Sequence, residues 1–172
     1  MTDPTVPAQP AIAATTEAIW QLLDRELRRV VPGVKVNACP PDRVRQEAGG
    51  RQINLFLFEI AEDAHLRAAA REALPAPLAL SLRYLLSVYG DDGDRADLSA
   101  HQVLSEAMRV LHENAVLPVG ATGTDAAATP PLHIVLQPMS LDEMSKLWGS
   151  WNSPYRLSVV YDVSPVLLGR RG

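Results

Sequence analysis

The side chains with the greatest potential for chemistry are four histidines and one cysteine. His101 and His112 are eleven residues apart, which returns almost to the same face of a helix. They would still lie about 16 Å apart along its axis at about 1.5 Å per residue, too far to share a metal ion. His65 and His133 have no cysteine or carboxylate at ligand spacing, so a metal site there would have to be assembled from distant segments. The sequence therefore predicts no metal and no other cofactor.

Two short motifs and the cysteine match reactive or ligand-binding patterns only in part. Residues Asp91 to Asp94 have the composition of a calcium loop, but Gln102 stands at the twelfth position, where a bidentate glutamate is needed. Residues Gly120 to Thr124 resemble a phosphate cradle without its lysine. No helix begins behind Cys39 to stabilise a thiolate. We interpret these features as a polar turn, a flexible loop and a buried, inert thiol.

Large apolar side chains recur over residues 141–155, just after a helix-start signal. Ser140 and Glu143 have the spacing of a capping box, so a short helix is predicted to begin there. Capping and the helix dipole also explain the adjacent carboxylates Asp142 and Glu143. The apolar stripe exceeds what so short a helix can bury alone, which leaves core packing and a partner surface as alternatives. The candidate partner-binding residues are Leu141, Met144, Trp148, Trp151 and Tyr155.

Hydrophobic periodicity predicts the elements that position these residues. Apolar positions spaced by three and four predict helices over 12–30 and 97–111, the second opened by Asp97 or by a Ser99–Gln102 capping box. Strands are predicted over 53–60, 78–88, 132–136 and 157–163, with a short strand at best over 34–37. The run 53–60 is apolar at nearly every position, which is typical of a central strand covered on both faces. Residues 64–74 are expected to form a short helix or an excursion loop, and 118–131 a loop that is mobile until bound.

Together these elements predict an α/β (α+β) fold in a single domain. The expected architecture is a mixed, mostly antiparallel sheet of four to five strands, flanked by two long helices and one short helix. The domain is expected to span residues 12–168, with a flexible arm over 1–11 and a short tail over 169–172.

Composition narrows the possible classes of function. The 172 residues carry 16 Lys and Arg against 20 Asp and Glu, so no excess positive charge is available to bind nucleic acid. A single cysteine excludes an internal disulfide, and no stretch reaches the roughly 18 apolar residues of a membrane span. We expect a cytoplasmic protein without nucleic-acid or membrane partners.

Five segments, in order along the chain, resemble the signatures of one family: residues 54–58, 82–90, 107–113, 140–148 and 154–161. The most specific feature is the combination of Tyr-Leu-Leu-Ser-Val-Tyr-Gly at 84–90 with Ser-Lys-Leu-Trp at 145–148. These segments are similar to the amino-terminal domain of the cap, or tail-terminator, proteins of phage-tail-like contractile injection systems of the virulence-cassette and antifeeding-prophage type. The resemblance covers nearly the whole chain.

The resemblance implies a structural protein with a tail-terminator-like fold and no enzymatic activity. Such caps form a six-fold ring that closes the inner tube and the contractile sheath and fixes particle length, so the implied partners are further copies of the chain, sheath and tube. Two alternatives remain open. One is an adaptor that loads cargo, and the other is a small-ligand enzyme or binding domain whose site combines the Asp91 to Asp94 turn, His133 and the 118–131 loop.

Overall fold

The computed structural model describes residues 11–44, 50–63, 78–91, 93–118 and 130–168. Its centre is one six-stranded sheet with the spatial order β1-β2-β3-β6-β5-β4. The β1–β2 pair is parallel and all other neighbours are antiparallel, so the sheet is mixed as expected. The strands are β1 (Lys35–Asn37), β2 (Gln52–Glu62), β3 (Leu78–Tyr89), β4 (Val116–Leu117), β5 (Leu132–Gln137) and β6 (Ser158–Leu168).

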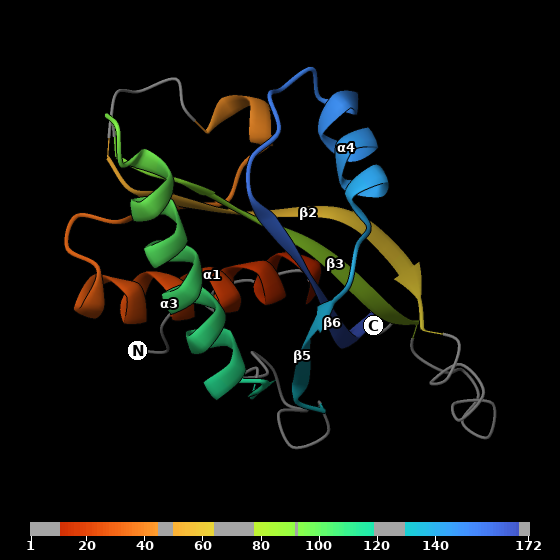
Figure 1. The fold of residues 1–172 in the computed structure, drawn as a ribbon. Coiled ribbons are helices and arrows are strands. Elements are labelled where there is room, and N and C mark those ends of the chain that lie inside the picture. The colour runs from red at the N-terminus through yellow and green to blue at the C-terminus, as the bar shows by residue number, and fades with distance from the viewer. Residues whose placement is uncertain (1–10, 45–49, 64–77, 92, 119–129, 169–172) are drawn as a thin grey trace, which may run out of the picture.

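The helices lie on both faces of this sheet (Figure 1). Helices α1 (Ala11–Val30) and α3 (Ala96–Glu113) cover one face, while the shorter α4 (Leu141–Ser150) covers part of the other. A short 3₁₀ turn, η1 (Pro41–Arg43), follows β1. The predicted two long helices and one short helix are therefore confirmed.

Helix α1 is amphipathic and packs along the sheet through one stripe of side chains. Leu23 and Leu27 in this stripe are fully buried. The indole N–H of Trp20 donates a hydrogen bond to the carbonyl of Val36 in β1 at 3.1 Å. The hydroxyl of Thr16 shares a hydrogen bond with that of Tyr84 in β3 at 2.8 Å. Polar contacts thus fix the helix at two points of the sheet that it covers.

Strand β3 contributes to two hydrophobic cores because successive side chains of a strand point to opposite faces. Leu82 and Leu86 belong to the large core beneath α1 and α3. Leu85 belongs to the smaller core beneath α4, where it meets Val160 of β6. All of these residues are buried, so β3 is covered on both faces at its centre.

The sheet differs from the sequence-based expectation in strand number and order. It has six strands instead of four to five, because the two-residue β4 is too short to give a periodic signal. The segment 53–60 was predicted to be a central strand covered on both faces. Strand β2 does lie between β1 and β3, but it is second in the sheet and pairs with β1 only over Gln52–Asn54. Beyond Asn54, no described strand lies on the outer side of β2. In β5, Leu132 and Ile134 are buried, whereas Leu136 at the end of the same alternation is half exposed.

The predicted capping box at Ser99 is wrong. Helix α3 begins at Ala96, and its N-cap residue, Arg95, makes no side-chain capping bond. Ser99 lies one turn inside the helix, where its hydroxyl donates to the carbonyl of Ala96 at 2.9 Å. Expectations for the arm up to residue 10, for the whole of 64–74, for most of 118–131 and for the tail fall outside the described residues.

Candidate docking surface

Helix α4 is held at its start by the predicted capping box. The N–H of Glu143 donates to Ser140 Oγ at 3.2 Å, and the N–H of Ser140 donates to Glu143 Oε2 at 2.9 Å. The side-chain hydrogen bond from Ser140, followed by the backbone one, lowers the pKa of Glu143. Asp142 pairs with Lys146 one turn along the helix at 2.7 Å. Both carboxylates therefore stabilise α4, as expected, and neither is placed for acid–base chemistry.

The apolar stripe of α4 builds an aromatic cluster on the sheet. Met144 and Trp148 are buried against Leu85 and Val160. The ring of Trp151 lies edge-on to Phe56 of β2 with centroids 5.3 Å apart, and edge-on to Trp148 at 5.7 Å. Edge-on pairs at these distances are favourable, so the cluster fixes the position of α4 on the sheet.

The five candidate partner-binding residues separate into two groups. Met144 and Trp148 are core residues, which favours the packing alternative for that part of the stripe. Leu141 is 71% exposed and Tyr155 is 48% exposed, while Trp151 is half-buried between the two groups. Tyr155 rests edge-on against Trp148, with centroids 6.4 Å apart. A role in partner binding for the exposed residues stays a prediction.

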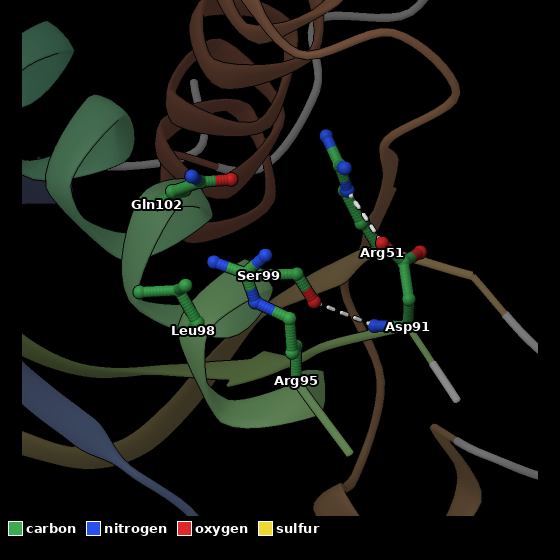
Figure 2. A pocket seen from close by; sticks show the side chains of 6 residues that line it. All are labelled: Arg51, Asp91, Arg95, Leu98, Ser99 and Gln102. Atoms are coloured by element: carbon green, nitrogen blue, oxygen red, sulfur yellow. Dashed lines mark hydrogen bonds and ion pairs between the residues drawn. The ribbon is translucent and has the colours of Figure 1, made fainter. Parts of the chain in front are cut away.

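A cavity of about 360 Å³ lies where β3 meets the start of α3 (Figure 2). It is lined by Arg51, Asp91, Arg95, Leu98, Ser99 and Gln102. The amide of Asp91 donates to Ser99 Oγ at 2.7 Å, and Arg51 Nε contacts the Asp91 carboxylate at 2.8 Å. These bonds bind the turn to the helix, so the acidic turn has a structural role at Asp91.

Gly90, just before this turn, allows the close approach of β3 and α3. A Cβ atom at this position would lie 1.7 Å from the carbonyl oxygen of Ala96 and 2.6 Å from Ser99 Oγ. Any other residue would therefore force backbone atoms apart. Gly90 ends the sequence motif at 84–90, but the contact that requires glycine involves a helix that begins six residues further on.

Two smaller hollows lie beside the same end of β3. One, of about 310 Å³, runs between the start of α3 and residues 155–157. The other, of about 180 Å³, is lined by Trp148 and by Arg156, whose guanidinium lies 5.6 Å from the centre of the Tyr89 ring. The larger of these two hollows is lined by the exposed Tyr155. That Tyr155 and Arg156 line a hollow was not predicted, because both residues precede the predicted strand 157–163 and carry no periodic pattern.

The proposed small-ligand site is not assembled in the described residues. His133 in β5 pairs with Ser164 of β6, whereas Ser87, near the Asp91 turn, pairs with Ser158. Six residues of strand, or about 20 Å, separate these pairs along β6. Asp91 and His133 therefore cannot act on one substrate. The third component, the 118–131 loop, lies largely outside the described residues.

Other reactive groups give no alternative site in the part of the chain that the structure describes. Burial raises the pKa of the Cys39 thiol, the reverse of an activated nucleophile. No group of three or more His, Cys, Asp or Glu side chains is placed to hold a metal ion. None of the described helices combines the length and apolar character needed to cross a bilayer. The candidate site is instead a surface near α4 and residues 155–157, where exposed aromatic and aliphatic side chains lie beside shallow hollows.

Comparison with known families identifies the chain. A family model described as the Pvc16 N-terminal domain matches residues 14–171. The chain belongs to the Pvc16 N-terminal domain family. The match contains all five of the segments that carried the resemblance, and it confirms that resemblance. A search of curated protein sequences gave no match.

Solved structures show the same fold in two terminators. The PVC sheath/tube terminator of an extracellular contractile injection system, in its extended state, aligns with a TM-score of 0.65 and 22% identity over 96% of this chain and 59% of that chain. The tube-terminating cap of the anti-feeding prophage aligns with a TM-score of 0.64 and 23% identity over 96% of this chain and 57% of that chain. The tail-terminator-like fold predicted from the sequence is thus confirmed. The chain spans a little under three-fifths of the length of either terminator.

Proposed function

We propose that this protein is a structural, non-enzymatic cap of a contractile injection particle. In this role it closes the inner tube and the sheath and fixes the length of the particle. The observation that carries the proposal is the fold: 96% of the chain superposes on two proteins whose names are sheath/tube terminator and tube-terminating cap. Membership of the Pvc16 family supports it independently of the superposition.

The proposed working form is a ring of six copies assembled in the cytoplasm with sheath and tube subunits. A closed ring needs heterologous interfaces, in which one patch of each subunit meets a different patch of the next. A stable interface of this kind buries about 1,000 Å² or more. The exposed side chains of Leu141, Tyr155 and Leu157 provide apolar surface of the type that such contacts use.

Deletion of the gene tests the function directly. Electron micrographs of the remaining particles are expected to show sheaths and tubes of uncontrolled length, and the wild-type chain is expected to restore a single length. Particles of normal length with an empty lumen would indicate a cargo adaptor. Particles of normal length and content would refute both roles.

A matched pair of variants tests the docking surface in the same assay. Leu141→Ser removes an apolar side chain that is 71% exposed on α4, and Val30→Ser removes one that is 48% exposed at the end of α1. Both changes should leave the isolated domain stable, because little buried surface is lost. Only Leu141→Ser is expected to reduce ring formation in native mass spectrometry and to weaken the rescue of particle length. Equal behaviour of the two variants would exclude this part of α4 from the interface.

A further inference from the structure

The two smaller hollows at the end of β3 lie next to each other, because Tyr89 and Arg156 line both of them. The hollow of about 180 Å³ is also lined by Trp148 and by Pro41 of η1. The hollow of about 310 Å³ is also lined by Tyr155. Figure 1 shows η1 beside the connection between α4 and β6 at this end of the sheet. We call the two hollows together the Tyr89–Arg156 groove.

The indole N–H of Trp148 is a buried donor without an acceptor in the described part of the chain. Trp148 is only 1% exposed, and its Nε1 makes no hydrogen bond with any described residue. The indole of Trp20, in contrast, donates to the carbonyl of Val36. A buried donor that stays unpaired costs free energy, so a buried indole usually has an acceptor. Because Trp148 lines the groove, a carbonyl group that enters the groove can supply the missing acceptor.

The groove is aromatic and mixed in charge. Tyr89, Trp148 and Tyr155 contribute rings to it. The ionisable side chains that line it are of both signs: Arg156, Asp42, Asp97 and His101. Such a lining does not select a strongly acidic or strongly basic ligand. Aromatic grooves of this kind bind proline-rich segments, whose extended backbone has no internal hydrogen bonds and therefore keeps its carbonyl groups available.

Residues 1–10 of the chain have a sequence that suits this groove. Pro4, Pro7 and Pro10 recur at every third position, and no other prolines of the chain are three residues apart. Asp3 is the only charged side chain in this segment. A polyproline II helix has three residues per turn and rises about 3.1 Å per residue, so the prolines would share one face at intervals of about 9 Å. Two successive prolines can therefore fill two neighbouring hollows.

Helix α1 begins at the end of the sheet away from the groove. Its Thr16 bonds Tyr84 in β3, and one turn later Trp20 bonds Val36 in β1. Through the pairing of β1, β2 and β3, Val36 lies in the same row of the sheet as Val88. Later residues of α1 therefore approach the groove end of β3, and the start of α1 lies towards the opposite end.

The prolines of one copy cannot fill the groove of that same copy. Tyr84 and Tyr89 are five residues apart, which is about 16 Å along β3. Ala11, the first residue of α1, lies about 7 Å further away, since it precedes Thr16 by five residues at about 1.5 Å each. If two successive prolines fill the hollows, at most the four residues from Pro7 to Ala11 are left to bridge this distance, and they span only about 12 Å. The groove must therefore be filled from another copy.

We propose that residues 1–10 of one copy dock in the Tyr89–Arg156 groove of a neighbouring copy. Two successive prolines occupy the two hollows, and a carbonyl between them accepts a hydrogen bond from the indole N–H of Trp148. This contact joins one patch of each subunit to a different patch of the next, which is the type of interface that a closed ring needs. The ring itself rests on the proposed function, whereas the docking can be measured on the isolated chain.

Binding of a synthetic peptide of residues 1–10 is the first test. The receptor is the full chain with Pro4→Ala, Pro7→Ala and Pro10→Ala, so that its own prolines do not compete. The indole N–H resonance of Trp148 is expected to shift downfield as it gains an acceptor, whereas that of Trp20 should stay in place. A peptide with alanine at the three proline positions should bind about tenfold more weakly or worse. An unchanged Trp148 resonance at about 1 mM peptide would overturn the proposal.

A matched pair of receptor variants tests whether the peptide lies in the groove. Tyr155→Ala and Val30→Ser each truncate a side chain that is 48% exposed, and Val30 lines neither hollow. Tyr155→Ala is expected to weaken peptide binding by about tenfold, whereas Val30→Ser should bind like the receptor without it. Near-ultraviolet circular dichroism checks that each variant is folded. A folded Tyr155→Ala variant with unchanged affinity would refute the groove as the site.

Native mass spectrometry of the full chain tests the choice of occupant. The triple proline-to-alanine variant is expected to raise the dissociation constant between copies by about tenfold or more, while Gln9→Ala, which keeps all three prolines, should assemble like the wild type. Peptide binding together with unchanged assembly of the triple variant would overturn docking between copies and assign the groove to a proline-rich segment of another subunit. Failure of the proposed function would instead appear as particles of normal length after gene deletion, whether or not the peptide binds.

Discussion

Replacement of Trp148 by alanine tests whether the aromatic cluster is a core or a docking site. The indole is only 1% exposed and contacts the rings of Trp151 and Tyr155. Truncation of a buried tryptophan to alanine costs about 3–5 kcal/mol, which includes the loss of such ring pairs at about 0.5–1.5 kcal/mol each. For a domain of this size, about 2–4 °C of melting temperature corresponds to 1 kcal/mol, so we expect Trp148→Ala to melt about 6–20 °C below the wild type.

The assay is urea unfolding of the isolated domain, followed by circular dichroism, with Leu141→Ala as the matched variant. Leu141 lies on the same helix but is 71% exposed, so its truncation should change the free energy of unfolding by about 0.5 kcal/mol or less. Trp148→Phe, which keeps a ring in the cluster, should fall between the two. If Trp148→Ala is as stable as the wild type, the indole is not part of a core. The assignment of α4 to the sheet face would then be refuted.

Three further substitutions probe the features that hold the fold in place. Gly90→Ala places a methyl group 1.7 Å from the carbonyl oxygen of Ala96 and should cost about 1–3 kcal/mol or more, whereas Gly149→Ala, with open space around it, should not destabilise the domain. Ser140→Ala removes the cap of α4 and should cost about 1 kcal/mol in denaturant unfolding, with the loss confined to the signal of the α4 tryptophans if the helix frays locally. Burial raises the pKa of Tyr84 from 10.0 to about 12. The folded protein therefore holds this proton more tightly than the unfolded chain, and the stability that depends on the neutral phenol is complete below pH 10 and is lost as the pH rises towards 12. The free energy of unfolding, measured at graded pH, should fall by about 3 kcal/mol over this range in the wild type and by less in Tyr84→Phe. Equal pH dependence of the free energy of unfolding in the two proteins would contradict the role of Tyr84.

Local sequence patterns predicted the elements whose signals are contained within one segment. The apolar stripe of α1, the alternation of β3 and the Ser140–Glu143 box each lie within about 20 residues, and each is where the pattern placed it. Helix α4 was expected to carry more apolar surface than it could bury. The structure shows why: the sheet face offered by Leu85 and Val160 is formed from two distant strands.

The errors concern features that depend on partners far away in the chain. Ser99 has the spacing of a cap, but the amide of Asp91 occupies its hydroxyl, and the helix starts one turn earlier. Strand β2 has the composition of a central strand, yet pairing order in a sheet is set by tertiary contacts that no local pattern contains. The same limit applies to the docking surface. Leu141 is exposed and Trp148 is buried on the same helix, and the sequence alone did not separate the two.

The position of β6 has a consequence for the synthesis of the protein. This strand comes after every other described element in the chain, but it lies between β3 and β5 in the sheet. The hairpin of β2 and β3 and the pair of β4 and β5 therefore cannot join until β6 has left the ribosome. Until then, the edges of β3 and β5 that pair with β6 have no partner strand within the chain, so a nascent chain carries two open sheet edges until its last strand is made.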